Sequence, residues 1–182
     1  MSYLRSLKPD AGLLQIFQAF PEIARPLLEY HEVLLRGDSR FSVAERELIA
    51  AYVSSLNNCD YCRAVHSQTA VALGIPAKTI AEMLSHPQSE HVDFPMQPVL
   101  AFVRKLTLSP GRITSADADQ VFAAGWNDRA LHDAVAICGL FNLMNRLVNG
   151  LGIEASESYT KLAAQRLAEC GYAQLLDFLR AK

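Results

Sequence analysis

The sequence lacks a long hydrophobic run and carries little net charge. No stretch approaches the roughly 18 uninterrupted apolar residues that a membrane helix needs, and the segment from Met1 to Lys8 has no apolar signal-peptide core. Lys and Arg number 17 against 19 Asp and Glu, which gives a formal charge of -2 and no overall positive charge for nucleic acid or acidic lipid. We therefore expect a cytoplasmic protein that binds neither nucleic acid nor a membrane.

Cysteine is also scarce. The chain of 182 residues has four cysteines, at positions 59, 62, 138 and 170, too few for a disulfide framework in a small secreted protein. Hydrophobic residues make up 51% and charged residues 20%, so the chain can bury a real core. We expect one domain over residues 1–182.

Strand-like alternation of apolar and polar residues is missing, whereas apolar residues recur at spacings of three and four. This pattern predicts an all-α fold, a single-domain helical bundle. Ser85 to Pro95 is expected to be a loop, and Ser115 is expected to cap a helix that Gly125 ends. The other helices are expected at about 13–20, 23–36, 43–56, 59–73, 98–108, 129–148, 156–170 and 172–179, with a short one after Pro76 and with Asn127 or Asp128 capping the longest.

The chemical signal is Cys59-x-x-Cys62-x-x-x-His66, within a motif core of about residues 42–73. On a helix these side chains fall within an arc of about 60°, so they share one face. Cys59 in the first turn has free amides and the helix dipole to favour its thiolate, and Cys62 has His66 one turn later to accept its proton. Either thiol is a candidate nucleophile, and a pair at this spacing can close a disulfide.

A carboxylate on the preceding helix is the candidate partner of His66. Glu47 shares a face with Ala50, Ala51 and Ser54, and such small residues allow another helix to approach closely. Glu45 is the competitor, because spacing alone does not show which Glu turns inward. Ser42-x-x-Glu45 also has the spacing of a capping box, which offers Glu45 a structural role.

Together these residues resemble a known family. Glu47, eleven residues before Cys59-x-x-Cys62-x-x-x-His66, is similar to the signature of the alkylhydroperoxidase AhpD-like branch of the carboxymuconolactone decarboxylase superfamily, and the whole chain resembles its peroxidase-related subgroup. The run from Phe141 to Arg146, followed by Leu151-Gly152, is similar to the family's C-terminal helix.

The resemblance implies an all-helical, oligomeric thiol peroxidase without cofactor or metal. It makes Cys62 the residue oxidised to a sulfenic acid, Cys59 the resolving thiol, and Glu47 with His66 the proton relay. A peroxide is the expected substrate, a lipoyl or thioredoxin-like protein a candidate reductant, and a homo-oligomer the expected assembly. Tyr61 is a departure, because some members have a His just before the second Cys.

Other interpretations of the motif compete with this one. A zinc site normally needs four ligands, and the sequence has no second Cys pair of this spacing. The two cysteines are alternatively inert core residues of a helical assembly protein, or the site of a thiol-disulfide oxidoreductase or redox sensor. A non-redox decarboxylase of the wider superfamily is disfavoured, because its chemistry has no use for a cysteine pair.

Several further residues are interpreted as structural rather than catalytic. Cys138 and Cys170 lie in helical runs where a lone Cys behaves as a small hydrophobe. Trp126 is interpreted as a packing anchor, and Asn145 with Arg146 as a buried polar pair that joins helices or subunits. No relay or ligand partner at suitable spacing is evident for the remaining histidines, His31, His86, His91 and His132.

Overall fold

The structure, a computed structural model, describes residues 2–85, 95–154 and 156–179. All regular elements in these ranges are helical, which confirms the predicted all-α fold. The elements are α1 (Leu13–Ala19), α2 (Pro21–Arg36), α3 (Val43–Leu56), α4 (Asp60–Ala72), α5 (Ala77–Ser85), α6 (Met96–Leu108), the 3-10 turn η1 (Pro110–Arg112), α7 (Ser115–Ala123), α8 (Asp128–Gly150), α9 (Glu157–Cys170) and α10 (Ala173–Asp177).

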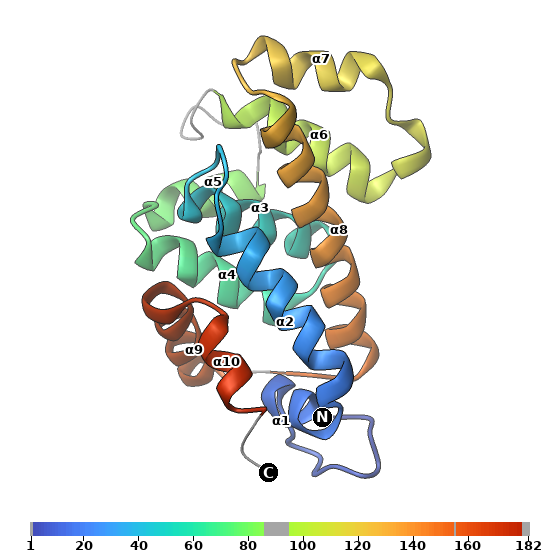
Figure 1. The fold of residues 1–182 in the computed structure, drawn as a ribbon, viewed down its shortest axis with the longest axis vertical. Helices are drawn as coiled ribbons and strands as arrows, with labels where there is room; N and C mark the ends of the chain where they lie inside the picture. Colours follow the sequence, from blue (N-terminus) through green and yellow to red (C-terminus); the bar gives the residue numbers. More distant parts are fainter. Residues whose placement is uncertain (1, 86–94, 155, 180–182) are drawn as a thin grey trace.

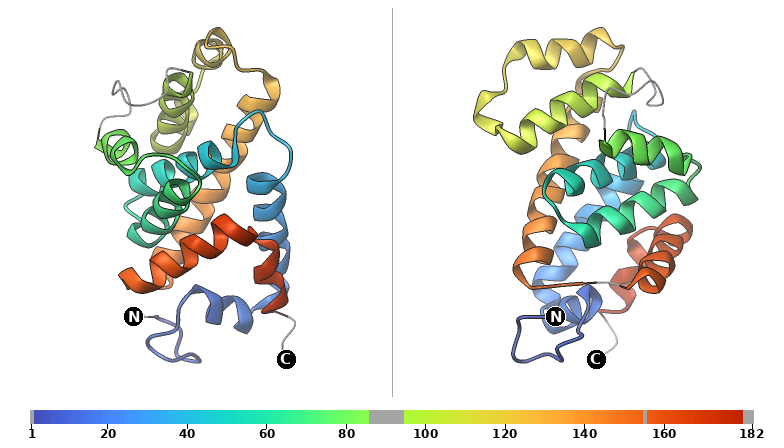
Figure 2. Two further views of the ribbon diagram at one scale, coloured as in Figure 1. Left: turned by 90° about the vertical axis from the view of Figure 1, so that its left-hand side faces the viewer. Right: turned by 180° about the vertical axis from the view of Figure 1, so that it is seen from behind.

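The long helix α8 runs along most of the molecule, with α2 beside it (Figure 1). α3 and α4 form a helical hairpin that packs against α8, and α9 covers the other side of α4. α6 and α7 lie at one end of the molecule, whereas α1 and α10 lie at the opposite end (Figures 1 and 2). Within the described ranges, no helix is long and apolar enough to cross a membrane.

The predicted capping box at the start of α3 is present. Ser42 Oγ accepts a hydrogen bond from the Glu45 amide at 3.2 Å, and Glu45 Oε2 accepts one from the Ser42 amide at 2.7 Å. The helix ends at Asn57, and Asn58 has a φ of 52°, a left-handed conformation that Asn tolerates better than most residues. The chain thereby reverses and enters α4 with Cys59 as the N-cap residue.

Small side chains explain how closely α4 lies on α3. Ala50, Ala51 and Ser54 are fully buried, as the sequence suggested for the face that carries Glu47. Ser54 Oγ donates to the carbonyl of Ala50 at 2.8 Å, so its hydroxyl costs little when buried. One hydrophobic core continues from this hairpin to α2, α6 and α8.

Two helix starts differ from the prediction. α7 is capped by Thr114 instead of Ser115, because Thr114 forms the capping box with Asp117, whose Oδ2 accepts from the Thr114 amide at 2.7 Å. α6 begins at Met96, two residues before the expected Pro98. Asn127, rather than Asp128, caps α8 by accepting from the Ala130 amide at 3.1 Å.

Trp126 is a packing anchor, as predicted. Its ring lies 4.5 Å from that of Phe41, and its Nε1 donates to the carbonyl of Pro95 at 2.6 Å. The expected loop at Ser85 to Pro95 falls mostly on residues 86–94, which lie outside the described residues together with His86 and His91.

Candidate active site

The α3–α4 hairpin brings the four predicted site residues together inside the protein. Glu47 projects from α3, Cys59 caps α4, and Cys62 and His66 lie on the first two turns of α4. Glu47 and Cys59 are 0% exposed, Cys62 is 2% exposed and His66 is 7% exposed. The sequence placed these residues on facing helices, and the short Asn57-Asn58 turn makes the helices adjacent.

Glu47 is the carboxylate that faces the site. Its Oε2 lies 2.6 Å from Nδ1 of His66, and because a carboxylate accepts, Nδ1 of His66 carries the proton of this hydrogen bond. Glu45 is engaged in the capping box at the start of α3 instead. The choice that the sequence left open is therefore decided by geometry.

Two residues that the sequence analysis did not find complete the surroundings of Glu47. Nη2 of Arg36 lies 2.7 Å from Glu47 Oε1, and the Tyr172 hydroxyl donates to the same oxygen at 3.1 Å. Burial disfavours the charged carboxylate, but the charges of His66 and Arg36 outweigh it and lower the pKa of Glu47. Glu47 is therefore a buried anion with both oxygens bonded.

The segment between α9 and α10 supplies Tyr172 from far along the chain. Glu32 of α2 holds this segment, because its Oε2 accepts hydrogen bonds from the amides of Tyr172 and Ala173 at 2.6 and 2.9 Å. Gly171 has a φ of 64°, and a Cβ there would lie 2.8 Å from Glu32 Oε2. Arg36 also stacks over the Tyr172 ring at 4.9 Å. No local pattern in the sequence signals this contact.

The two motif cysteines shift each other's pKa in opposite directions. A hydrogen bond from the Cys62 thiol lowers the pKa of Cys59 to about 7, although burial opposes this shift. The same hydrogen bond, together with burial, raises the pKa of Cys62. The first proton that the pair loses therefore leaves its negative charge mainly on Cys59, while Cys62 keeps its proton as a donor.

Asn145 of α8 is the polar residue that supports this pair. Its Nδ2 donates to Ser54 Oγ at 3.0 Å, its Oδ1 accepts from Asn57 at 3.0 Å, and its amide lowers the pKa of Cys59. The expected role in joining helices is thus correct for Asn145. It is wrong for Arg146, which is exposed and bonds to Asn142 of its own helix.

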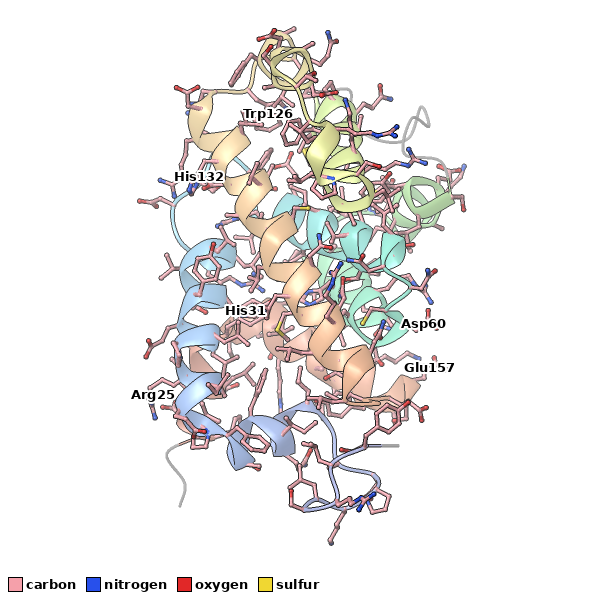
Figure 3. All side chains as sticks on the ribbon, turned by 90° about the vertical axis from the view of Figure 1, so that its right-hand side faces the viewer. Arg25, His31, Asp60, Trp126, His132 and Glu157 are labelled. Carbon is pink, nitrogen blue, oxygen red and sulfur yellow. The ribbon has the colours of Figure 1, made fainter. Side chains whose placement is uncertain are left out.

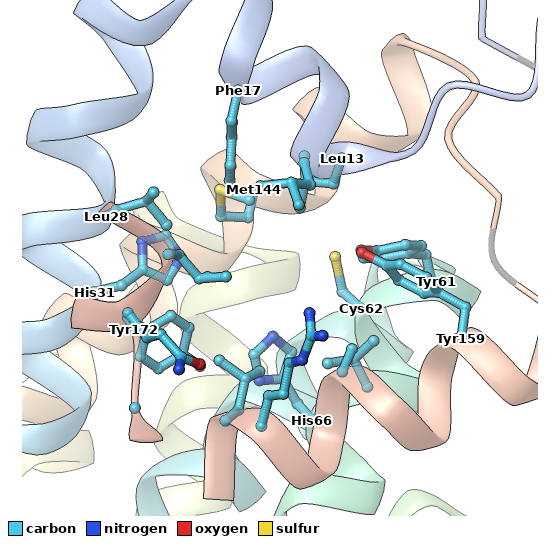
Figure 4. Close-up of a pocket in the computed structure, with 18 of the residues that line it drawn as sticks. Leu13, Phe17, Leu28, His31, Tyr61, Cys62, His66, Met144, Tyr159 and Tyr172 are labelled. Atoms are coloured by element: carbon cyan, nitrogen blue, oxygen red, sulfur yellow. The ribbon is translucent and has the colours of Figure 1, made fainter. Parts of the chain in front are cut away.

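A cavity of about 120 Å³ opens in front of Cys62 and His66 (Figure 4). Apolar side chains such as Leu13, Phe17 and Met144 form much of its wall. Cys59 is absent from the lining and packs behind Cys62 among apolar residues instead. A small molecule in the cavity would therefore meet the sulfur of Cys62 first.

His31 also lines this cavity, a position that the sequence analysis did not assign to it. It lies on the inner face of α2, between α2 and α8, whereas His132 projects from the surface of α8 (Figure 3). Its position in the apolar stripe of α2, next to Leu27, Leu28, Leu34 and Leu35, was the available signal. Burying a polar side chain costs free energy unless it has a hydrogen-bond partner, so a histidine within an apolar helix face is a candidate functional residue.

The remaining candidates lie away from the chemistry or at its edge. Tyr61, the departure from the family pattern, lines the cavity, and its hydroxyl donates to that of Tyr159 at 3.3 Å. Cys138 is buried as expected, but Cys170 is exposed and does not pack as a small hydrophobe. No group of three or more His, Cys, Asp and Glu suited to a metal occurs among the described residues.

Comparison with known proteins relates this site to a family. The sequence profile of the carboxymuconolactone decarboxylase family matches residues 21–91, which contain all four motif residues. This part of the chain is similar to that family, and the structure has an AhpD-like fold. No curated protein matches the chain.

Several solved structures share the fold. A peroxidase-related protein from Silicibacter sp. TM1040 is 23% identical, with a TM-score of 0.75 over 87% of this chain and 94% of that one. An AhpD-core, peroxidase-related protein from Ralstonia eutropha JMP134 is 22% identical, with a TM-score of 0.76 over 82% and 78%. A Cys-to-Ala variant of the debrominase Bmp8, in complex with 2,3,4-tribromopyrrole, is 15% identical, with a TM-score of 0.71 over 86% and 81%.

Proposed function

We propose that this protein is a thiol peroxidase that reduces hydroperoxides with the Cys59–Cys62 pair. The observation that carries the proposal is the position of Cys62, which faces an apolar cavity beside His66 while His66 is bonded to a buried, anionic Glu47. Similarity of residues 21–91 to the carboxymuconolactone decarboxylase family, and a fold shared with peroxidase-related proteins, support an enzyme of this kind.

The chemistry follows from the tautomer of His66. Because Nδ1 donates to Glu47, Nε2 is free to take the proton of Cys62. The resulting thiolate attacks the terminal oxygen of the hydroperoxide, the oxygen–oxygen bond breaks, and the leaving alkoxide takes the proton from His66. The thiol becomes a sulfenic acid and the hydroperoxide becomes an alcohol, so atoms and electrons balance.

The second half of the cycle uses Cys59. Its thiolate, favoured by a pKa of about 7, attacks the sulfur of the sulfenic acid on Cys62. A disulfide forms and hydroxide leaves, which takes a proton to become water. An external dithiol must then reduce the disulfide and return both cysteines to thiols.

The burial of the two cysteines limits which kinds of reductant can reach them. Cys59 and Cys62 are 0% and 2% exposed, so the folded surface of another protein has little access to either sulfur. A dithiol carried on a thin, flexible arm enters a narrow cavity more readily than a thioredoxin-like surface does. This favours a lipoyl-type donor, and it counts against a general thiol-disulfide oxidoreductase that acts on protein disulfides.

Peroxide consumption under turnover tests the proposal. Reduced protein with excess dithiothreitol is mixed with hydrogen peroxide or cumene hydroperoxide, and peroxide loss is followed. Wild type and Cys138→Ser, a matched change of a buried cysteine outside the cavity, should consume peroxide, and Cys62→Ser should not. Equal loss in all three, or bromide release from tribromopyrrole without any peroxide reduction, would reject a thiol peroxidase.

A further inference from the structure

A second imidazole shares the cavity with His66. His31 is 3% exposed, and its ring packs edge-on to Phe141 at 6.1 Å and lies 5.1 Å from the ring of Tyr172. His66 contacts the same Phe141 ring at 4.5 Å. Figure 4 shows His31 on one side of the cavity and Cys62 on the other, with His66 between them at its base in this view. His31 has no role in the peroxidase chemistry described above.

The protonation of His31 follows from its surroundings. Its Nδ1 lies 2.7 Å from the carbonyl oxygen of Leu27, and since a carbonyl can only accept, Nδ1 carries a proton. Burial lowers the pKa of His31 to about 4, so the ring is neutral near pH 7. The neutral ring has one proton, and Nε2 therefore presents a lone pair.

That lone pair has no partner in the described part of the chain. Among the described residues, His31 makes one hydrogen bond, through Nδ1. Nε2 makes none and is not fully enclosed by protein atoms. Because the ring lines the cavity, Nε2 is open to it. The cavity thus offers an acceptor without a donor, because the polar side chains that also line it, such as Tyr61, Tyr159 and Arg166, make no hydrogen bond to His31.

We propose that His31 binds the substrate, with Nε2 accepting a hydrogen bond from the terminal O–H of an organic hydroperoxide whose hydrocarbon part fills the apolar cavity. This inference rests on the proposed peroxidase function. The terminal oxygen carries the only proton of such a hydroperoxide, and it is also the oxygen that Cys62 attacks. A bond from this proton to His31 holds the substrate in the cavity and leaves His66 free to handle the thiol proton.

The cavity volume limits the organic part. About 120 Å³ is close to the roughly 150 Å³ apolar cavity that holds one benzene ring. A single aromatic ring or a short branched alkyl group therefore fills the cavity, and cumene hydroperoxide, which carries one such ring, serves as the probe. Hydrogen peroxide would form the same hydrogen bond but would leave the apolar wall uncovered, so its KM should be higher.

Two ligands of the same shape separate the hydrogen bond from simple filling of the cavity. 2-Phenylpropan-2-ol has a hydroxyl where tert-butylbenzene has a methyl group, and neither reacts with a thiol. Wild type should bind 2-phenylpropan-2-ol about threefold to tenfold more tightly than tert-butylbenzene, and His31→Leu should lose that preference. The ¹⁵N resonance of His31 Nε2 in wild type should also shift with the alcohol and stay in place with the hydrocarbon.

Kinetics provide the second test. The hydrogen bond to His31 exists in both the bound substrate and the transition state, so His31→Leu should raise KM for cumene hydroperoxide about threefold to tenfold and leave kcat within about twofold. A folded His31→Leu protein with unchanged KM overturns the inference, as does a wild-type Nε2 resonance that ignores the alcohol. If wild type consumes no hydroperoxide, the peroxidase proposal fails, while the ligand pair still decides whether His31 binds a donor.

Discussion

Nδ1 of His66 and Oε2 of Glu47 form a buried hydrogen bond of 2.6 Å between α4 and α3. Arg36 and Tyr172 hold the other carboxylate oxygen at 2.7 and 3.1 Å, so the carboxylate cannot turn away. This arrangement fixes the tautomer of His66 and directs Nε2 away from Glu47. The nitrogen that we propose accepts the proton of Cys62 is therefore oriented before any substrate binds.

Glu47→Gln should slow the reaction with peroxide. The amide keeps the shape of the side chain but loses the charge that favours imidazolium at His66, so the rate at neutral pH should fall within or just below the 10² to 10⁴-fold range typical of acid-base help. Raising the pH should partly restore the rate. Stopped-flow peroxide consumption, run well below the unfolding midpoint of each variant, measures the effect.

Glu45→Gln is the matched control for that change. Glutamine still serves in a capping box, so the rate should stay unchanged and the free energy of unfolding should fall by about 1 kcal/mol or less. An unchanged rate in Glu47→Gln would remove Glu47 from the relay. A large loss of rate in Glu45→Gln would show that the wrong carboxylate had been assigned.

The roles of the two cysteines can be separated by trapping the sulfenic acid. Cys62 faces the cavity whereas Cys59 is enclosed, so peroxide should oxidise Cys62 even though Cys59 is the more acidic thiol. In Cys59→Ser, dimedone should label Cys62 after one equivalent of peroxide, because no resolving thiol remains. Labelling of Cys59 in Cys62→Ser, together with an inert Cys59→Ser, would reverse the roles.

The rate at which iodoacetamide alkylates the Cys59–Cys62 pair, followed by peptide mass spectrometry, should depend on pH near neutrality. A Cys59 pKa of about 7 means that the pair is mostly protonated below this pH and mostly singly ionised above it, so the rate should rise about tenfold per pH unit below 7 and then level off. Cys62→Ala removes the donor that lowers the pKa of Cys59, and the inflection should move to higher pH. Cys62→Ser keeps a donor and should move it less. An inflection near the ordinary thiol pKa in wild type would contradict the paired geometry.

The α3–α4 hairpin could be predicted from the sequence because its determinants are local. A capping box, the Asn57-Asn58 turn and the spacing of Cys59, Cys62 and His66 lie within one short segment. The same holds for the all-α fold, which follows from apolar spacing. The Glu45 or Glu47 alternative needed the structure, since helix spacing alone does not show how far α3 is rotated.

Arg36 and Tyr172 were missed because their roles depend on contacts that no local pattern encodes. Tyr172 reaches Glu47 across 125 positions of the chain, and only the docking of the α9–α10 turn on Glu32 brings it there. His31 was within reach of prediction, because a histidine in a leucine-rich helix face is unusual. That this face lines the same cavity as Cys62 could not be predicted, because it depends on how α2 packs against α8.

We expect the protein to form a homo-oligomer through α8. Val135 and Leu143 are 41% and 47% exposed on the outer face of α8, and Gly139 between them has open space where a side chain would lie. Two apolar residues flanking a glycine allow a helix of a second copy to pack closely. Light scattering at micromolar concentration should give a multiple of 20.1 kDa for wild type.

Leu143→Lys should lower that mass, whereas His132→Lys, at an exposed position on the same helix, should not. A mass near 20.1 kDa for wild type would contradict the assembly. An unchanged mass in Leu143→Lys would exclude this face of α8 as the contact.

The central claim is that Cys59 and Cys62 form one redox unit, and intact-protein mass spectrometry tests it most directly. Fully reduced protein is treated with a single equivalent of cumene hydroperoxide, and its mass and peptide map are compared with those of the untreated protein. We predict a loss of about 2 Da from one internal Cys59–Cys62 disulfide, with Cys138 and Cys170 still reduced. An unchanged mass, or oxygen added to Cys138 or Cys170 while the pair stays reduced, would contradict the account.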